Sequence, residues 1–343
     1  MRSSSTFSCN ANFPSQSLSP LEVLRAYPFN FMITSSDISS AAKRIEGIIH
    51  KTPILTSKFF NNLAGAEIFF KCENFQKTGS FKARGATNSI LKLSKTEAAK
   101  GVTTHSSGNH GQALAWAARE NGIKAYIVMP KNAPSVKVDA VKEYGAEVVF
   151  CESTLEARET TLEEVMVKTG ATFIPPFNYQ NTIEGQATSA FEVFQDIENL
   201  DFLLAPVGGG GLLSGSALSA KYFSSQTTVF GCEPEEADDA FQSLKTGILQ
   251  PAKKPTTIAD GLRTSLGDIT FGYIQNDVND ILLCSEKEIV ETQKMIWERM
   301  KIVVEPSSAV PLACLLNNTD GFRGKRLAII LSGGNVDLGK LPF

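Results

Sequence analysis

The 343-residue sequence has little of what marks several large functional classes. Its three histidines do not have the spacing of zinc ligands. Its six cysteines lie far apart without a Cys-x-x-Cys pair, which predicts a reduced, cytoplasmic protein and not a disulfide scaffold. A formal net charge of −3 without a basic block does not favour nucleic acid or a membrane surface as a partner. No apolar run reaches the length of a transmembrane helix.

Three common sequence motifs are absent as well. No Gly-x-Gly-x-x-Gly run occurs, and no Gly-Lys-Ser or Gly-Lys-Thr follows a glycine-rich loop. The Gly-x-Ser-x-Gly elbow of many serine hydrolases is also missing. These absences argue against a dinucleotide-binding fold, a P-loop enzyme and a Ser-His-Asp hydrolase.

Residues 1–31 differ from the rest of the chain. They are rich in serine, poor in charge and without periodicity, and they lack the apolar core of a secretory signal. We expect a disordered leader there, or an upstream start before the real one near Met32, because chain termini are often disordered. A transit peptide is the alternative interpretation.

From Met32 onward, strand-like and helix-like segments alternate. Val102–His105 and Glu147–Cys151 read as strands, as does Ala125–Met129 before Pro130. Gln112–Glu120 and Ser135–Tyr144 have helical spacing. This alternation predicts an α/β fold with mostly parallel sheets. The length exceeds that of one hydrophobic core, so we expect two domains.

Three of the loops that follow predicted strands are rich in glycine and serine. Ligands of parallel α/β sheets bind beyond the carboxyl ends of the strands, so these loops are the first places to look for a site. The run Gly208–Gly211 leaves backbone N–H groups bare before a predicted helix, which suits a phosphate group. A flexible turn is the alternative for this tetraglycine loop.

Lys82 is a candidate for covalent chemistry. A lysine amine can form a Schiff base with an aldehyde cofactor where it is partly desolvated. Lys82 follows Phe81 and the small-residue turn Thr78-Gly79-Ser80, so it is predicted to begin a helix. A solvated surface lysine is the alternative.

Four motifs in order carry a resemblance to a known family. They are Ser80-Phe81-Lys82, Ser107-Gly108-Asn109-His110, the tetraglycine loop and Ser332-Gly333-Gly334-Asn335. Together they resemble the fold-type-II pyridoxal-phosphate enzymes, and most closely the group of serine racemases and serine/threonine ammonia-lyases (dehydratases). The resemblance extends from about Met32 to the end of the chain.

The resemblance implies a two-domain α/β fold like that of the tryptophan synthase β subunit. Two parallel-sheet domains would hold pyridoxal 5′-phosphate between them. Residues 32–98 and 181–343 would form the large cofactor-binding domain, and residues 99–180 the small one.

The resemblance also assigns roles in the cofactor site. Lys82 would carry the cofactor, Phe81 would lie beside its ring, and Asn109 would bind its 3′-oxygen. Ser332 would face the pyridine nitrogen and leave it unprotonated, which favours elimination over a long-lived carbanion. The implied cofactor contacts are Phe81, Lys82, Asn109, Asn178, Gly208, Gly209, Gly210, Gly211, Leu212 and Ser332.

The loop that contains the second motif would bind the substrate carboxylate through its backbone amides. The implied substrate contacts are Ser106, Ser107, Gly108, Asn109 and His110. In the racemase branch, Lys82 and Ser107 would exchange the α-proton on opposite faces; the alternative is that Ser107 only helps to bind the carboxylate. His110 is interpreted as a structural residue of the loop, because lysine already supplies the base.

Two further sites follow from the resemblance. Mg²⁺, or Ca²⁺ or Mn²⁺, would bind the carboxylates of Glu233 and Asp239 and the carbonyl of Ala237. The alternative is an acidic first helical turn. ATP would bind as an effector at a subunit interface, although ordinary surface residues are the alternative there. The residues that match its contacts are Lys77, Thr78, Gln112, Tyr144, Lys301 and Asn335.

The predicted reaction is the elimination of water from L-serine or L-threonine, which gives ammonia and pyruvate or 2-oxobutyrate. Serine racemisation would share the same carbanion-like state. The alternatives are a protein that is mainly a serine racemase, a threo-3-hydroxyaspartate ammonia-lyase with Arg158 as a carboxylate partner, a β-replacement synthase, and a non-catalytic amino-acid-binding protein. A homodimer is expected.

Overall fold

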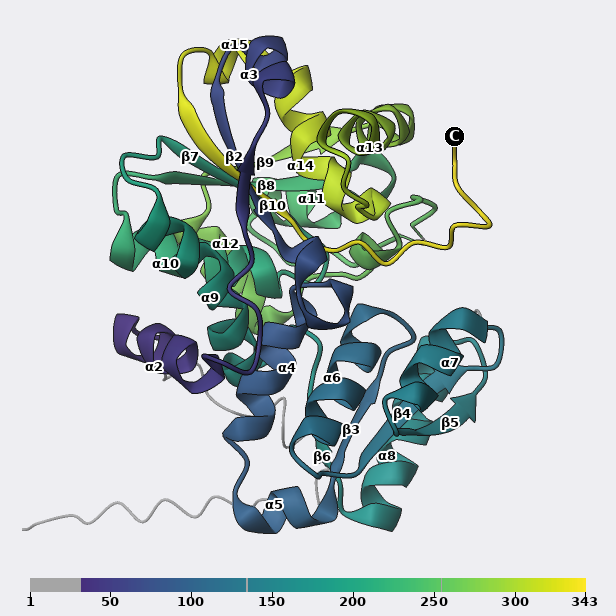
Figure 1. Cartoon of the computed structure of the whole chain (residues 1–343). Helices are drawn as coiled ribbons and strands as arrows, with labels where there is room; N and C mark the ends of the chain where they lie inside the picture. Colours follow the sequence, from purple (N-terminus) through teal and green to yellow (C-terminus); the bar gives the residue numbers. More distant parts are fainter. Residues whose placement is uncertain (1–31, 134, 254) are drawn as a thin grey trace, which may run out of the picture. The chain divides into compact units, whose positions relative to one another are not determined.

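The computed structural model describes residues 32–133, 135–253 and 255–343, which all belong to one structural unit (Figure 1). The leader predicted for residues 1–31 lies outside the described residues. In the described part of the chain, no helix is both long and apolar enough to span a membrane.

A six-stranded sheet contains the strands that lead into two of the glycine-rich loops. Its order is β1-β2-β10-β7-β8-β9, in which β1 pairs antiparallel with β2 and every other pairing is parallel. The strands are β1 (Ile54–Thr56), β2 (Glu67–Cys72), β7 (Phe202–Pro206), β8 (Thr228–Pro234), β9 (Asp280–Cys284) and β10 (Arg326–Leu331).

A four-stranded parallel sheet has the order β5-β4-β3-β6. Its strands are β3 (Val102–His105), β4 (Ala125–Pro130), β5 (Glu147–Cys151) and β6 (Thr172–Phe173). The predicted α/β class with parallel sheets is therefore confirmed. This sheet lies inside the range 99–180, but the division of the chain into two domains stays a prediction.

Helices surround both sheets. The α-helices are α2 (Ser35–Ile45), α3 (Lys58–Ala64), α4 (Lys82–Leu91), α5 (Lys95–Lys100), α6 (Asn109–Glu120), α7 (Ser135–Glu143), α8 (Leu155–Thr169), α9 (Gln180–Asp196), α10 (Gly211–Phe223), α11 (Asp239–Thr246), α12 (Asp268–Asp277), α13 (Glu286–Met300), α14 (Pro306–Asn317) and α15 (Thr319–Phe322). The 3₁₀ helices are η1 (Glu73–Phe75), η2 (Lys77–Gly79), η3 (Glu235–Ala237) and η4 (Asp260–Leu262).

Most predicted boundaries agree with the structure to within a residue. Helix α4 begins at Lys82, as expected. Helix α6 begins at Asn109, however, three residues before the predicted Gln112. Asparagine, histidine and glycine are weak helix formers, so a prediction from propensity starts the helix too late. The second half of the second motif, Asn109 and His110, therefore begins a helix, while Ser107 and Gly108 remain in the loop.

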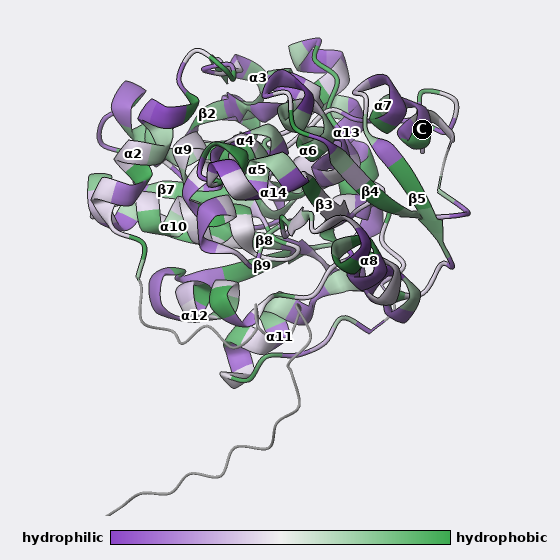
Figure 2. Ribbon diagram, turned by 90° about the horizontal axis from the view of Figure 1, so that it is seen from below, coloured by the Kyte–Doolittle hydropathy of each residue, from purple (hydrophilic) through white to green (hydrophobic). Residues whose placement is uncertain are grey.

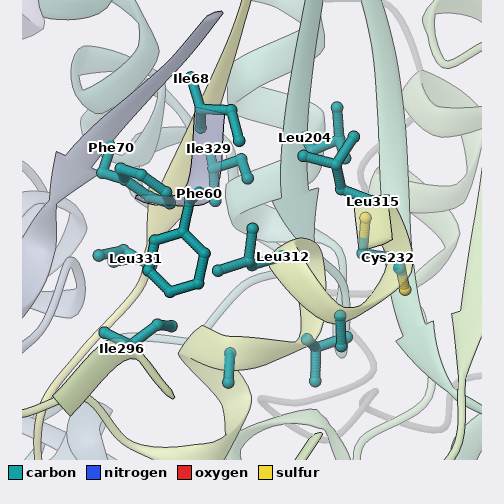
Figure 3. Packing of buried hydrophobic residues seen from close by; sticks show 14 of the residues in the cluster. Phe60, Ile68, Phe70, Leu204, Cys232, Ile296, Leu312, Leu315, Ile329 and Leu331 are labelled. Carbon is teal, nitrogen blue, oxygen red and sulfur yellow. The ribbon is translucent and has the colours of Figure 1, made fainter. Parts of the chain in front are cut away.

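Both faces of the six-stranded sheet are buried. On one face, side chains of β2 and β10 pack against α3, α13 and α14, as Phe70, Leu331, Phe60, Ile296 and Leu312 show in Figure 3. On the other face, strand residues pack against α9 and α10. Burial on both faces explains the continuous apolar strands. In Figure 2 the outer helices α8 and α12 instead alternate hydrophilic and hydrophobic bands.

Helices α4, α9 and α10 approach one another closely because small residues line their contacts. A Cβ atom on Gly185 would lie 2.6 Å from the Cα atom of Gly85, and one on Gly215 would lie 2.6 Å from the backbone nitrogen of Ala187. Larger side chains would push the helices apart. Gly85 is one turn beyond Lys82, so this packing also fixes the start of α4.

Candidate active site

Lys82 is the first residue of α4, and its amine points to the segment before α9. Its Nζ donates to the carbonyl oxygen of Pro176 at 2.8 Å and lies 4.9 Å from the centre of the Phe81 ring. Desolvation of the amine lowers its pKa to about 8, against the opposing effect of the Glu305 carboxylate. A larger fraction of the Lys82 amine is therefore neutral, which is the nucleophilic form, at neutral pH than in a solvated lysine.

A buried ionic cluster of Lys71, Glu73, Arg84 and Glu192 holds the first turn of α4. Arg84 Nε lies 2.7 Å from Glu73, Arg84 Nη1 lies 2.7 Å from Glu192, and Lys71 Nζ lies 2.6 Å from Glu192. The cluster connects β2, η1 and α9 to the helix that starts with Lys82. No sequence pattern indicated it, because charged residues are usually solvated.

The tetraglycine loop connects β7 to α10. Gly210 has a φ of 88°, and a Cβ atom on Gly209 would overlap the ring of Phe177. The first N–H groups of a helix have no partner within the helix, so those at the start of α10 can bind an anion. Leu212 is 4% exposed and packs in the core, so it can contribute only its backbone. This glycine-lined turn fits a phosphate group.

The loop after β3 leads directly into α6. Ser106 and Ser107 are half-buried there, and the Ser106 hydroxyl accepts a 3.4 Å bond from Gly108 N. His110 is buried, with Nε2 2.9 Å from the Ile174 carbonyl oxygen, and burial lowers its pKa to about 3. A neutral histidine bound to the backbone agrees with the structural interpretation of this residue.

Glu305 is a site residue that the sequence analysis missed. Its two carboxylate oxygens accept from Asn109 Nδ2 at 3.0 and 3.1 Å. Burial raises its pKa to about 7, and the nearby Asp260 acts in the same direction. The available signal was a single acidic residue between the apolar run Ile302–Val304 and the Pro306 that starts α14.

Ser332 follows β10 and is 2% exposed. Its hydroxyl oxygen lies 3.1 Å from that of Ser308 on α14. The Ser308 hydroxyl donates to the Gly333 carbonyl at 2.6 Å and accepts from the Gly333 N–H at 2.7 Å. The turn that carries Ser332 is therefore fixed to α14, a contact that the four motifs did not indicate.

The structure brings the four motifs together. The first and fourth meet where Phe81 N donates to the Ser332 carbonyl at 3.0 Å. The second and fourth meet where Asn335 Nδ2 donates to Asn109 Oδ1 at 2.9 Å. The tetraglycine loop joins them through residues 176–178, which contact both Lys82 and Gly209. Two of the glycine-rich loops follow the neighbouring parallel strands β7 and β10 and therefore leave the same edge of the six-stranded sheet.

Asn178 contacts the start of α12, which the resemblance did not indicate. Its Oδ1 accepts from the backbone N–H groups of Ile269 and Thr270 at 3.0 and 3.4 Å, and its Nδ2 donates to Asp268 at 2.6 Å. Asn178 thus caps α12 beside the tetraglycine loop. A direct contact with the cofactor stays a prediction.

The acidic stretch of residues 233–239 places two carboxylates close enough together that one raises the pKa of the other. Glu233 lies near the end of β8 and accepts from the N–H groups of Ala240 and Phe241 at 3.2 and 2.9 Å. Both carboxylate oxygens of Asp239 are buried without a hydrogen-bond partner. Burial raises the pKa of Glu233, with a further rise from Asp239, and it raises the pKa of Asp239 to about 6. Such an unpaired buried carboxylate fits a hard cation.

This acidic stretch offers few protein ligands. Across residues 32–133, 135–253 and 255–343, no group of three or more His, Cys, Asp or Glu side chains is arranged to hold a metal ion. A cation beside Asp239 would therefore need backbone carbonyls such as that of Ala237, and water, in addition to the two carboxylates.

Two of the six residues that are predicted to contact ATP, Thr78 and Asn335, lie next to each other. Asn335 Nδ2 donates to the Thr78 carbonyl at 2.8 Å, and Thr78 has a φ of 58°. Within the described residues, no hydrogen bond or ion pair joins the other four to this pair. Those four occupy η2, α6, the end of α7 and the end of α13, at Lys77, Gln112, Tyr144 and Lys301.

Comparisons with known proteins agree with this geometry. The β-hydroxyaspartate dehydratase of Paracoccus denitrificans (strain Pd 1222) is 46% identical over 313 residues, which cover 91% of this chain and 99% of that protein. The serine racemase of Dictyostelium discoideum is 49% identical over 313 residues, covering 90% and 97%. The crystal structure of a threonine deaminase from T.th. superposes with a TM-score of 0.85 at 41% identity, covering 89% of this chain and 99% of that one.

A protein-family model described as pyridoxal-phosphate dependent enzyme matches residues 45–333. The match covers most of the chain and includes nearly all of the four motifs. With the neighbouring structures, it confirms the predicted fold-type-II architecture. The chain belongs to the family of pyridoxal-phosphate-dependent enzymes.

Proposed function

We propose that this enzyme is an ammonia-lyase (dehydratase) that converts L-serine or L-threonine to ammonia and pyruvate or 2-oxobutyrate, with serine racemisation at the same site. The observation that carries the proposal is the desolvated amine of Lys82 beside the tetraglycine loop. Residues 176–178 contact both the amine and the loop. Bound pyridoxal phosphate supplies an electron sink that weakens the bonds at the substrate α-carbon.

Lys82 takes the α-proton from the substrate in this proposal. A base must be neutral before it can accept a proton, and the lowered pKa of about 8 makes the neutral amine available. In the free-amine form of Lys82 the Pro176 carbonyl accepts one hydrogen bond from Nζ, which defines the position of the base once the lysine is released from the cofactor. The tetraglycine loop would hold the cofactor phosphate, and Asn109 would hold the 3′-oxygen.

The substrate carboxylate binds where β3 runs into α6. Residues 106–108 form the loop before α6, and Asn109 and His110 are the first residues of the helix, so the free N–H groups and the dipole of the helix N-terminus favour an anion here. Ser107 lies in this loop and is the candidate to exchange a proton on the face opposite Lys82. Ser332 would face the pyridine nitrogen of the bound cofactor, and its hydroxyl would not protonate that nitrogen as a carboxylic acid would.

The experiment is a product assay with the holoenzyme. Wild type should form pyruvate from L-serine and 2-oxobutyrate from L-threonine, with D-serine as a second product. Lys82→Ala should lose all three products. Ser107→Ala should lose D-serine formation while pyruvate formation falls less, because only racemisation needs a proton on the second face. A wild-type holoenzyme that forms none of these products would overturn the proposal.

A second candidate substrate is L-threo-3-hydroxyaspartate, and Arg158 is the observation that favours it. Arg158 lies in the first turn of α8, after β5, and β5 lies in the same parallel sheet as β3. Its Nε is buried without a hydrogen-bond partner. Burial is the main cause that lowers the pKa of His105, and the positive charge of Arg158 lowers it further. His105 is the residue directly before Ser106. A guanidinium there suits a second carboxylate.

Arg158→Met tests the second candidate, because methionine removes the charge and keeps most of the volume. We expect the kcat/KM for L-threo-3-hydroxyaspartate to fall at least tenfold while that for L-serine changes little. Lys168→Met, at an exposed position near the end of the same helix, is the matched control. Equal losses for the two substrates would show that Arg158 does not select the second carboxylate.

A divalent cation, Mg²⁺ or alternatively Ca²⁺ or Mn²⁺, is the proposed partner of Glu233, Asp239 and the Ala237 carbonyl. It would neutralise two carboxylates that the fold holds in a buried place. The observation behind this proposal is the pair of unpartnered oxygens of Asp239.

The remaining proposals concern the assembly and its regulation. ATP acts as an effector near Thr78 and Asn335, which are joined by a hydrogen bond. Asn335 also donates to Asn109, and this bond connects the effector region to the active site. The protein is a homodimer, and its residues divide into the large and small domains given above.

A cytoplasmic location agrees with the free state of the five cysteines in the described residues. A β-replacement synthase would require an intermediate that persists until a second nucleophile is added.

A further inference from the structure

Thr270 lies on α12 and contacts the tetraglycine loop from outside the four motifs. Its side chain is fully buried, and its hydroxyl donates to the Gly209 carbonyl at 2.8 Å. The same oxygen accepts from the Gly267 N–H at 2.9 Å and lies 3.1 Å from the Gly267 carbonyl. A hydroxyl has one proton, so the shorter contact identifies the Gly209 carbonyl as its main acceptor.

This hydrogen bond controls the orientation of a whole peptide unit. The carbonyl of Gly209 and the N–H of Gly210 belong to one planar trans peptide, so they point in opposite directions. When Thr270 fixes the carbonyl, it also fixes the direction of the Gly210 N–H. Glycine has the greatest backbone freedom of all residues, so four in succession would not hold this direction by themselves.

Thr270 is itself held firmly. Asn178 Oδ1 accepts from its backbone N–H at 3.4 Å, and Ser214 Oγ donates to its carbonyl oxygen at 3.2 Å. A Cβ atom on Gly210 would lie 2.8 Å from the Cβ of Thr270 and 2.8 Å from Leu266 Cδ2, so the loop packs directly on this residue. The start of α12 therefore acts as a rigid support for the loop.

The same support is connected to Lys82. Residues 176–178 contact Lys82 through the Pro176 carbonyl, Gly209 through the Phe177 ring and α12 through the Asn178 cap. The lysine amine and the tetraglycine loop are thus held at a fixed separation by α12 and this segment. A cofactor that is joined to the lysine and bound at its phosphate requires that separation.

We propose that Thr270 is a positioning residue that aims the Gly210 N–H at the cofactor phosphate and so sets the affinity for that phosphate. The inference rests on the proposed function, because it requires the phosphate to bind in the tetraglycine loop. It goes further in assigning part of the cofactor affinity to a hydroxyl that does not touch the cofactor.

The test compares two aldehydes that differ only in the phosphate. Protein freed of cofactor is titrated with pyridoxal phosphate and, separately, with pyridoxal, while the absorbance of the lysine adduct is followed. Thr270→Val removes the hydroxyl and keeps the shape. We expect the Kd for pyridoxal phosphate to rise roughly tenfold, the loss of about one hydrogen bond, and the Kd for pyridoxal to stay within about twofold. Thr270→Ser keeps the hydroxyl and should retain most of the affinity.

Thr227→Val is the matched control. Thr227 is a buried threonine whose hydroxyl donates to the Leu200 carbonyl at 2.8 Å, and it lies just before β8, at the end of the sheet opposite the tetraglycine loop. It should lose stability without changing either Kd. If Thr270→Val weakens both aldehydes equally, or neither, the positioning role is wrong. A wild-type protein that forms an adduct with neither aldehyde would overturn the proposed function and this inference with it.

Discussion

Asn109 donates its side-chain amide to both carboxylate oxygens of Glu305, at 3.0 and 3.1 Å, across 196 positions of sequence. The bond joins the first turn of α6 to the residue before α14, and therefore the four-stranded sheet to the six-stranded sheet. It also places a carboxyl group with a pKa of about 7 beside the residue proposed to bind the cofactor 3′-oxygen. The charge of Glu305 then changes within the physiological pH range.

Glu305→Gln should alter how the stability of the cofactor-free protein depends on pH. Burial raises the pKa of this carboxyl from 4.5 to about 7, so the folded state keeps a proton that the unfolded state releases. The free energy of unfolding should therefore fall as the pH rises from about 4.5 to about 7, by about 3 kcal/mol for this group. In the glutamine variant that part of the slope should disappear.

Urea unfolding at a series of pH values measures this slope. Glu298→Gln, which changes an exposed carboxylate on α13, is the control and should keep the wild-type slope. A Glu305→Gln variant with an unchanged slope would mean that the folded protein holds this carboxyl ionised.

Asp239→Asn should abolish a stabilising response to divalent cations. Mg²⁺ should raise the Tm of the wild type by about 5 °C, because it binds the folded state alone. The response should grow as the pH rises through about 6, where Asp239 loses its proton and becomes a better ligand. Thermal unfolding with and without Mg²⁺ measures it.

Asp238→Asn is the control for the cation experiment, since the Asp238 carboxylate is already bound by Gln242 at 2.7 Å. That variant should respond as the wild type does. A cation response that survives Asp239→Asn would place the ion elsewhere or show that binding is unspecific.

Arg84→Met should destabilise the protein by about 3–5 kcal/mol, because it leaves Glu73 and Glu192 without their shared buried cation. Lys287→Met breaks an exposed pair with Glu291 at 3.8 Å and should cost less than about 1 kcal/mol. Chemical unfolding of the two variants gives the comparison. Similar small losses for both would show that the buried ionic cluster is not what holds the start of α4.

The sequence predicted those parts of the fold that depend on local pattern. Alternating apolar segments identified the strands, and the small-residue turn before Lys82 identified the start of α4. The rule that ligands bind beyond the carboxyl ends of parallel strands identified the glycine-rich loops as places to look for a site. Each of these inferences used residues close together in the chain.

The parts that could not be predicted depend on contacts between distant residues. Glu305, Thr270 and Ser308 lie outside the four motifs and contact them only after folding. The local sequence around each residue does not indicate which motif it meets. The contact of Asn178 with α12 was not indicated either: its side-chain oxygen caps the helix, because the backbone N–H groups there need an acceptor. Side-chain pairing of this kind is set by tertiary structure, which propensity and spacing do not encode.

Peptide mapping after borohydride reduction tests the central claim most directly. Borohydride reduces the bond between the cofactor and its lysine to a stable amine, and mass spectrometry then identifies the modified residue. We predict the adduct on Lys82. An adduct on another buried lysine, such as Lys71, or no adduct in a protein that contains bound pyridoxal phosphate, would contradict it.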